Sequence, residues 1–364
     1  MRKRVTFCVV ASLMLLCASC ANRNSNSGQT VTFEEADSDA AFKDLVSHIE
    51  LTRLNEDSYL MGLELSIIPC SGGVVLVDKR NTKVARFSEQ GEFQNEIGKK
   101  GNGPGEYVHL LGVQVDADVV TVFAAPDKIL EYDLEGNLLT DRSCKGLGSS
   151  AYKSSTGLYT YYGYSGVEQY RVAYFPEDGE KQCYLPVETK LLPLSLGNDI
   201  FSHSDDIYML DSYSNTVYQL SEEGCKEHIS FDFGDYAIGD EFYSFNDAFK
   251  SAEYLMSSDN ALIYRYVPGP EHSIVQVNLK SSSSPASKVV YGISDSKGWK
   301  WFALDADKEM KSVCGPFRYF KDNVLYAILE PGQVSKFVEE FKEKVVEGQT
   351  DEEDSHYIAK IWLD

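Results

Sequence analysis

The sequence predicts an all-β protein: one six-bladed β-propeller with a single short helix before its closing strand. Three observations predict this fold. Short runs of alternating apolar residues recur along most of the chain, which indicates half-buried strands. The pattern repeats about every 45 residues, and short strands at that period are typical of propeller blades. Glycines mark one turn in four copies, at Gly91, Gly136, Gly179 and Gly224, at intervals of 45, 43 and 45 residues.

The first four copies each consist of a strand, a polar turn, a second strand and the turn that holds the glycine. Their paired apolar runs are 74–78 with 83–87, 119–123 with 128–132, 158–161 with 170–174, and 207–211 with 216–220. Glycine suits the second turn because a positive φ costs it nothing. One such unit cannot cover its own two faces, so the copies are expected to pack on one another around a ring.

Two weaker copies complete the predicted ring. Their apolar runs are 261–266, 273–279 and 288–291 in the fifth copy, and 317–320 and 324–329 in the sixth. Helical apolar spacing in Gln333–Val346 replaces the third strand of the sixth copy. We therefore expect Tyr357–Leu363 to take that third place, with Ile49–Leu54 paired outside it. This pairing would join the two ends of the chain and leave no open strand edge.

The N-terminus predicts export. A basic start at residues 2–4 precedes an apolar run at residues 5–16, which is too short for a permanent membrane span and fits a signal peptide. Ala18 and Ser19 stand directly before Cys20, an order that resembles the bacterial lipobox, in which the cysteine receives the lipid. Cys17 departs from that pattern, because a larger aliphatic residue is usual there. An ordinary secretory signal cleaved nearby is the alternative.

Three segments follow from this interpretation: residues 1–19 as a lipoprotein signal peptide, 20–31 as a flexible tether and 32–364 as the propeller. The full chain has a net charge of −22, and without residues 1–19 it keeps 31 basic and 56 acidic residues, a net charge of −25. Such acidity argues against nucleic acid and against direct contact with anionic lipid. We expect membrane attachment through the anchor only, at the outer membrane. The periplasmic face is favoured because residues 21–26 hold no acidic run.

One motif carries a family resemblance. Residues 98–107 read GKKGNGPGEY and lead into GVQVD at 112–116. This segment resembles the NHL-type propeller repeat. The whole chain resembles the six-bladed, NHL- or TolB-like propeller lipoproteins of Bacteroides-type bacteria, which share the lipoprotein start and the helix before a closing strand. The resemblance implies that Gly98–Tyr107 connects the outermost strand of one blade to the innermost strand of the next.

We expect this motif to be structural. Its glycines and proline allow a sharp backbone path, and φ > 0 is expected at Gly103 and Gly105. Glu106 is expected to accept hydrogen bonds from neighbouring loop amides. The alternative, a cradle for an external anion, lacks the helix with a basic or hydroxyl residue that follows phosphate loops. The structural residues of the loop are Gly101, Gly103, Pro104, Gly105 and Tyr107.

No catalytic residue, metal site or cofactor is predicted. None of the six histidines has a second ligand at a typical zinc spacing, and no GxSxG segment is present. Tyrosines crowd residues 159–174, and Trp299 and Trp301 lie before the sixth copy. Packing between blades explains such aromatic residues more simply than platforms for sugars or proteins.

By analogy with other propellers, a ligand is expected over the central channel, on the face of the loops between second and third strands and of the links between blades. The candidate residues there are Arg80, Asn81, Glu106, Asp127, Lys128, Tyr213 and Asn215. The predicted function is a binding or scaffold module for an envelope protein, peptide or glycan, and a monomer is expected. The alternative is a metal-dependent, carbohydrate- or lactone-active enzyme with its site over the channel.

Overall fold

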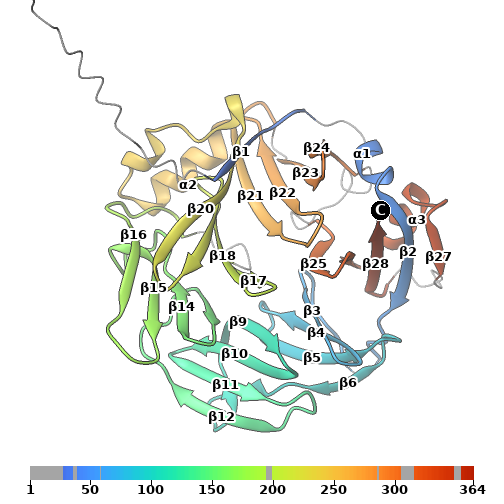
Figure 1. The fold of residues 1–364 in the computed structure, drawn as a ribbon, viewed down its shortest axis with the longest axis horizontal. Helices are drawn as coiled ribbons and strands as arrows, with labels where there is room; N and C mark the ends of the chain where they lie inside the picture. The colour runs from blue at the N-terminus through green and yellow to red at the C-terminus, as the bar shows by residue number, and fades with distance from the viewer. Residues whose placement is uncertain are drawn as a thin grey trace, which may run out of the picture.

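In the computed structural model the described part of the chain forms six β-sheets of four or five strands, arranged as the blades of a propeller, and one separate two-stranded sheet (Figure 1). The predicted six-bladed fold is therefore confirmed. The structure describes residues 28–35, 39–57, 59–193, 199–284, 287–304, 315–347 and 354–364. The signal peptide and Cys20 lie outside these residues. Within them, no helix has the length and apolar character that a membrane crossing requires.

Each of the first five blades has four antiparallel strands in chain order, from the channel to the rim. Blade 1 consists of β3 (Ser66–Cys70), β4 (Gly73–Asp78), β5 (Lys83–Ser88) and β6 (Phe93–Glu96). Blade 2 consists of β9 (His109–Asp116), β10 (Val119–Ala125), β11 (Lys128–Tyr132) and β12 (Leu138–Ser143). Blade 3 consists of β13 (Ser150–Lys153), β14 (Gly157–Tyr161), β15 (Tyr170–Pro176) and β16 (Gln182–Pro186).

Blades 4 and 5 follow the same order. Blade 4 consists of β17 (Ile200–His203), β18 (Asp206–Asp211), β19 (Thr216–Ser221) and β20 (Gly224–Asp232). Blade 5 consists of β21 (Asn260–Val267), β22 (Ile274–Lys280), β23 (Ser287–Asp295) and β24 (Gly298–Phe302). Because neighbouring blades cover both faces of each sheet, the second strands are buried along nearly their whole length. All six residues of β4 are buried, for example.

Blade 6 joins the two ends of the chain, as predicted. Its strands are β25 (Phe317–Lys321), β26 (Val324–Leu329), β28 (Tyr357–Leu363) and β2 (Val46–Arg53). The closing strand β28 pairs with β26 on one side and with β2 on the other, both antiparallel. The predicted helix Gln333–Val346 is too long: α3 spans Val334–Glu340, and β27 (Val345–Glu347) adds a parallel strand outside β2. The valines of this segment also fit the helical spacing, so the sequence pattern did not reveal where the helix ends and the strand begins.

The N-terminal segment holds three blades together, and the predicted tether therefore ends too late. Residues 29–32 form β1 (Gln29–Thr32), which pairs in parallel with β20 of blade 4. The chain then passes blade 5, where Trp301 Nε1 donates to the Thr32 carbonyl at 3.1 Å, and continues through α1 (Ala40–Lys43) into β2 of blade 6 (Figure 1). Backbone hydrogen bonds to the outer edge of β20 hold this short polar segment in place.

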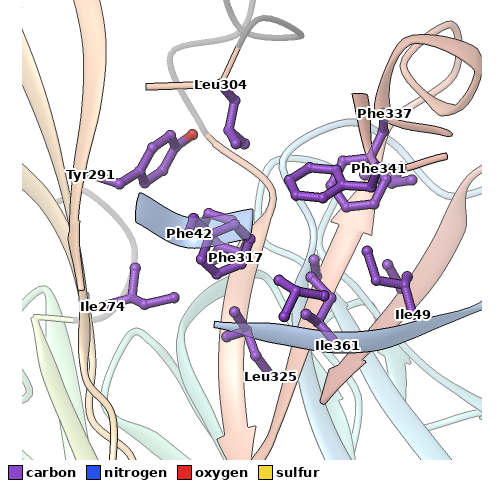
Figure 2. Packing of buried hydrophobic residues seen from close by; sticks show 14 of the residues in the cluster. Phe42, Ile49, Ile274, Tyr291, Leu304, Phe317, Leu325, Phe337, Phe341 and Ile361 are labelled. Carbon is purple, nitrogen blue, oxygen red and sulfur yellow. The ribbon is translucent and has the colours of Figure 1, made fainter. Parts of the chain in front are cut away.

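The contact between blades 5 and 6 has an aromatic centre supplied by α1. Phe42 is fully buried and stacks on Phe302 of blade 5, with ring centroids 4.8 Å apart. It meets Phe317 of blade 6 edge-on at 5.1 Å and also contacts Phe341 after α3. Figure 2 shows Phe42 close to Phe317, with Phe341 farther to the right beside Phe337. The Phe42 side chain thus packs between blades 5 and 6 and connects the N-terminal segment to both.

Candidate functional site

Strand direction sorts the loops onto two faces of the ring. Second strands and fourth strands end at one face, which therefore carries the links between blades and the loops between second and third strands. We call this the link face. All seven residues predicted to contact a ligand belong to its segments: Arg80, Asn81, Glu106, Asp127, Lys128, Tyr213 and Asn215. The predicted face is thus the one on which the structure places them.

Most of these side chains already have partners within the protein. Asn81 Nδ2 donates to Asp78 Oδ2 at 2.8 Å, and Asp127 Oδ1 accepts from the Gly146 amide at 3.1 Å. Lys128 Nζ donates to the carbonyl of Glu106 at 2.9 Å. These contacts fix loops rather than present free groups to a ligand. Arg80, by contrast, is exposed.

Tyr213 and Asn215 are buried between blades. Tyr213 is 3% exposed, and its hydroxyl donates to the Leu192 carbonyl at 2.5 Å. Asn215 Oδ1 accepts from the Ile263 amide and its Nδ2 donates to the Ala261 carbonyl, both at 3.3 Å, so it clamps blade 4 to blade 5. Its φ of 50° places it in the left-handed region, which asparagine tolerates better than most residues. The seven residues therefore do not converge on one site, and ligand contact stays a prediction for them.

The glycine-rich motif binds its own carboxylate. Glu106 Oε2 accepts from the Gly103 amide at 2.8 Å, and Lys99 Nζ lies 3.3 Å from Glu106 Oε1. The Gly103 amide, and then Lys99, hold the pKa of Glu106 below its usual range. Tyr107 is buried and donates to the Ile97 carbonyl at 2.8 Å. The segment runs from β6 to β9 through the short pair β7 (Lys99–Lys100) and β8 (Glu106–Tyr107), as the resemblance implied.

The expected positive φ is correct for Gly105 and wrong for Gly103. Gly105 has φ 65°, and a Cβ there would lie 3.0 Å from the Leu138 side chain. Gly103 is outside the left-handed region; a Cβ there would instead lie 3.0 Å from Glu106 Oε2. The restriction at Gly103 therefore comes from the carboxylate that its own amide binds.

Gly105→Val is expected to lower the free energy of unfolding by about 1–3 kcal/mol, because a β-branched residue is strained at positive φ. Gly103→Ala is the matched comparison, since only the flexible end of Glu106 must move there, and a smaller loss is expected. Urea denaturation followed by circular dichroism measures both. Equal stability of the Gly105→Val variant and the unmodified protein would contradict the structural role of this loop.

The largest link-face feature that the sequence analysis missed is an insertion between blades 4 and 5. It runs from Phe233 to Asp259 and contains α2 (Ala248–Ser257). The Asp247 side chain caps the helix by accepting from the amides of Phe249 and Lys250. Only Ser251 and Leu255 are buried within it, so its apolar stripe is too narrow to stand out in the sequence. The sequence signal that could have indicated this helix was Asp247, because aspartate is favoured at the N-cap position.

The α2 insertion rests on a buried cluster shared by blades 3 and 4. Leu255 packs with Tyr164, Leu191, Tyr213 and Phe242. Beneath them Arg171 Nη1 contacts Asp211 Oδ2, which also accepts from the Tyr164 hydroxyl at 3.2 Å. Burial raises the pKa of Tyr164 above its usual range, and Asp211 adds to that shift. Five of the crowded tyrosines are buried, which confirms packing as their role: Tyr159, Tyr161, Tyr162, Tyr164 and Tyr174.

Exposed apolar side chains are concentrated on the link face. Of eight large apolar residues that are exposed in the described ranges, five lie on its segments: Leu60, Leu63, Val167, Phe249 and Met256. Phe249 and Met256 are 88% and 76% exposed, and their spacing of seven places them on one side of α2. The insertion around them holds six acidic residues and one basic residue, Lys250. α2 thus presents an apolar pair within an acidic surface.

Nothing in the described part of the chain forms a group of three or more His, Cys, Asp or Glu side chains that could hold a metal ion.

The comparisons with known proteins agree with this architecture. A Bacteroides fragilis protein named as an exported protein is 18% identical, with a TM-score of 0.72 over 92% of this chain and 100% of that one. A Bacteroides vulgatus member of the DUF4221 family is 10% identical, with a TM-score of 0.52 over 88% of this chain and 97% of that one. These likenesses show a shared fold. No curated protein matches the chain. The family described as "Domain of unknown function (DUF4934)" matches residues 29–360, and the chain belongs to this family.

Proposed function

We propose that this protein is a non-enzymatic binding module that docks a basic protein or peptide on its link face, around α2. The observation that carries the proposal is the exposed pair Phe249 and Met256, at 88% and 76%, within an acidic insertion. Exposed apolar residues surrounded by charges are typical of protein interaction sites. A partner that offers apolar side chains with Lys or Arg around them complements this surface.

A protein partner fits the link face better than a glycan does. Sugar rings are usually bound on exposed Tyr or Trp. Trp301 and five tyrosines of blade 3 are buried here, and Trp299 is half-buried, in contact with Phe231. The exposed groups on α2 are instead a phenylalanine and a methionine, and methionine adapts well to protein surfaces.

The geometry of β1 supports anchoring that leaves the link face free. β20 runs toward the link face and β1 is parallel to it, so the chain enters β1 from the opposite face. Eight residues separate Cys20 from Gln29, and they can span at most about 30 Å. We propose that this protein is an outer-membrane lipoprotein that faces the periplasm. A lipid on Cys20 would then hold blade 4 near the membrane.

A photo-crosslinking residue in place of Phe249, in the full chain in its native cells, is expected to capture a discrete partner. The apolar pair should lie at the centre of the contact and exclude water there. The matched control is the same residue in place of Leu139, which is also exposed but lies on the outer strand β12. Immunoblots and mass spectrometry of the adducts give the readout.

Met256→Glu should abolish the adduct at position 249 without changing the melting temperature, because Met256 packs against little. Adducts of equal yield at positions 249 and 139 would indicate nonspecific contact and contradict the proposal. Absence of any adduct at position 249 would contradict it as well.

A further inference from the structure

Three aromatic rings of blade 3 surround the ammonium group of Lys181. Lys181 Nζ lies 4.7 Å from the ring centroid of Tyr170, 5.5 Å from that of Phe175 and 5.8 Å from that of Tyr162. Tyr162 directly follows β14, Tyr170 and Phe175 belong to β15, and Lys181 directly precedes β16. We call the three rings the aromatic cage. Cations are attracted to the faces of aromatic rings within about 6 Å of the centroid, and all three rings meet that condition.

Contacts with the rest of the protein hold the aromatic cage. Tyr162 is 6% exposed, and its hydroxyl donates to the carbonyl of Gly146, in the link between blades 2 and 3, at 2.6 Å. The rings of Tyr162 and Tyr170 meet edge-on, with centroids 5.7 Å apart. Phe175 packs against a buried cluster that includes Leu158. The rings therefore do not depend on Lys181 for their positions, and the cage is preorganised for a cation.

The surroundings of the cage are acidic. Glu168 Oε1 lies 3.4 Å from Lys181 Nζ. The turn that carries Lys181 contains three further acidic residues, all of them exposed: Glu177, Asp178 and Glu180. Negative charge at the surface raises the local concentration of cations and disfavours anions. Aromatic faces beside a carboxylate thus select a cation here.

Lys181 itself is held weakly in the cage. The side chains of Lys181 and Glu168 are 33% and 32% exposed, so solvent screens their ion pair. A primary ammonium group is strongly hydrated in water, and fixing the long lysine side chain costs conformational entropy. Both effects offset the attraction to the rings. A cation that is less hydrated and brings no such flexible link can therefore displace Lys181.

The spacing of the rings suits a methylated nitrogen. A methyl carbon lies about 1.5 Å from its nitrogen and packs about 3.5–4.0 Å from other carbon atoms, so a quaternary nitrogen lies about 5–5.5 Å from each ring. The distances from Lys181 Nζ, 4.7 to 5.8 Å, span that range. A quaternary ammonium also has no N–H group to donate to water, so it loses less hydration than a primary ammonium when it enters the cage.

We propose that the aromatic cage binds a quaternary ammonium group, with Glu168 as its counter-ion, and that Lys181 takes the place of this group in the structure. A soluble compound such as choline and the headgroup of a choline lipid both carry this chemistry. The cage contains no residue of α2, and it is independent of the docking surface around that helix.

Lys181→Ala should bind choline about ten-fold or more tightly than the unmodified full chain does, because the competing lysine is gone. Titration followed through the methyl signal of choline in NMR spectra measures both dissociation constants. The neutral analogue of choline, in which a tert-butyl group replaces the trimethylammonium group, should bind Lys181→Ala about ten-fold more weakly than choline does. Lys226→Ala is the matched control, because it removes an exposed lysine of β20, and its affinity for choline should equal that of the unmodified chain.

Tyr170→Leu, added to Lys181→Ala, should remove most of the gain in affinity, since Tyr170 is half-buried and leucine keeps an apolar side chain without the ring. If this double variant does not fold, the comparison of choline with its neutral analogue on Lys181→Ala decides. Cosedimentation of Lys181→Ala with phosphatidylcholine vesicles that free choline abolishes would assign the group to a lipid, and binding of choline alone to a soluble compound. Equal affinities of Lys181→Ala and Lys226→Ala for choline, equal binding of choline and its neutral analogue, or no binding of choline to Lys181→Ala would overturn the proposal.

Discussion

Removal of residues 356–364 is expected to abolish the cooperative unfolding of the propeller. These residues contain β28, which lies between β26 and β2 and pairs with both. In the described structure β26 and β2 are joined in the sheet through β28 and do not pair with each other. Tyr357, Ala359 and Ile361 are fully buried, and Ile358 is nearly so. Burial of the larger of these side chains contributes about 1.5–3 kcal/mol each, and their sum reaches the range of the whole stability of a typical domain, about 5–15 kcal/mol.

The deletion also removes two connections outside blade 6. His356 Nδ1 lies 2.8 Å from Glu56 Oε2 in the link to blade 1, and His272 Nε2 of blade 5 lies 3.2 Å from the Asp364 carbonyl. Both neighbours of blade 6 thus lose a contact, and β2 loses its antiparallel partner. We expect either insoluble protein or a broad transition without a folded baseline.

Urea denaturation followed by circular dichroism and tryptophan fluorescence measures this outcome. Lys360→Ala is the control within the same strand, because Lys360 is half-buried and charged, and its loss should cost about 1 kcal/mol or less. A truncated protein with the midpoint and slope of the full chain would show that the ring does not need this strand.

The sequence analysis predicted the closure because each pairing strand has a local signal. Tyr357–Leu363 and Ile49–Leu54 both alternate or concentrate apolar residues, and a ring leaves them no other partner. β1 has no such signal: it has four residues, and only Val31 is buried. Its pairing depends on the exposed edge of β20, which no local pattern reveals.

The sequence predicted on which face of the ring the candidate residues lie, but not whether their side chains are free to contact a ligand. Loop position follows from strand order, so the seven residues lie on the expected face. Whether a side chain is free depends on other blades: Asn215 bonds the backbone of β21, 46 and 48 residues away. The lining of the central channel could not be predicted for the same reason, since residues such as Arg265 and Arg318 are 53 apart in the sequence and contribute to one cavity only in the closed ring.

Asp211→Asn is expected to lower the free energy of unfolding by about 3–5 kcal/mol, because it leaves the Arg171 guanidinium buried without its carboxylate. The side chains of Arg171 and Asp211 are 12% and 1% exposed. Burial alone would lower the pKa of Arg171, but Asp211 and Tyr164 reverse that effect and raise it. Asparagine keeps the shape of the site and, through its single carbonyl oxygen, the acceptor for the Tyr213 amide, while its NH2 group takes the place of the oxygen that accepts from the Tyr164 hydroxyl. The loss therefore reports the missing charge together with this one changed hydrogen bond.

Glu168→Gln is the matched control for this prediction, because Glu168 and Lys181 form an ion pair of 3.4 Å whose side chains are 32% and 33% exposed. Solvent screens such a pair, and its loss should cost about 1 kcal/mol or less. Adding Arg171→Leu to Asp211→Asn should recover part of the stability, since the uncompensated charge is then gone. Chemical denaturation of the four proteins, with the unmodified chain as reference, measures each step. Equal losses for Asp211→Asn and Glu168→Gln would mean that the buried pair contributes no more than a surface pair, and that blades 3 and 4 are joined by aromatic packing alone.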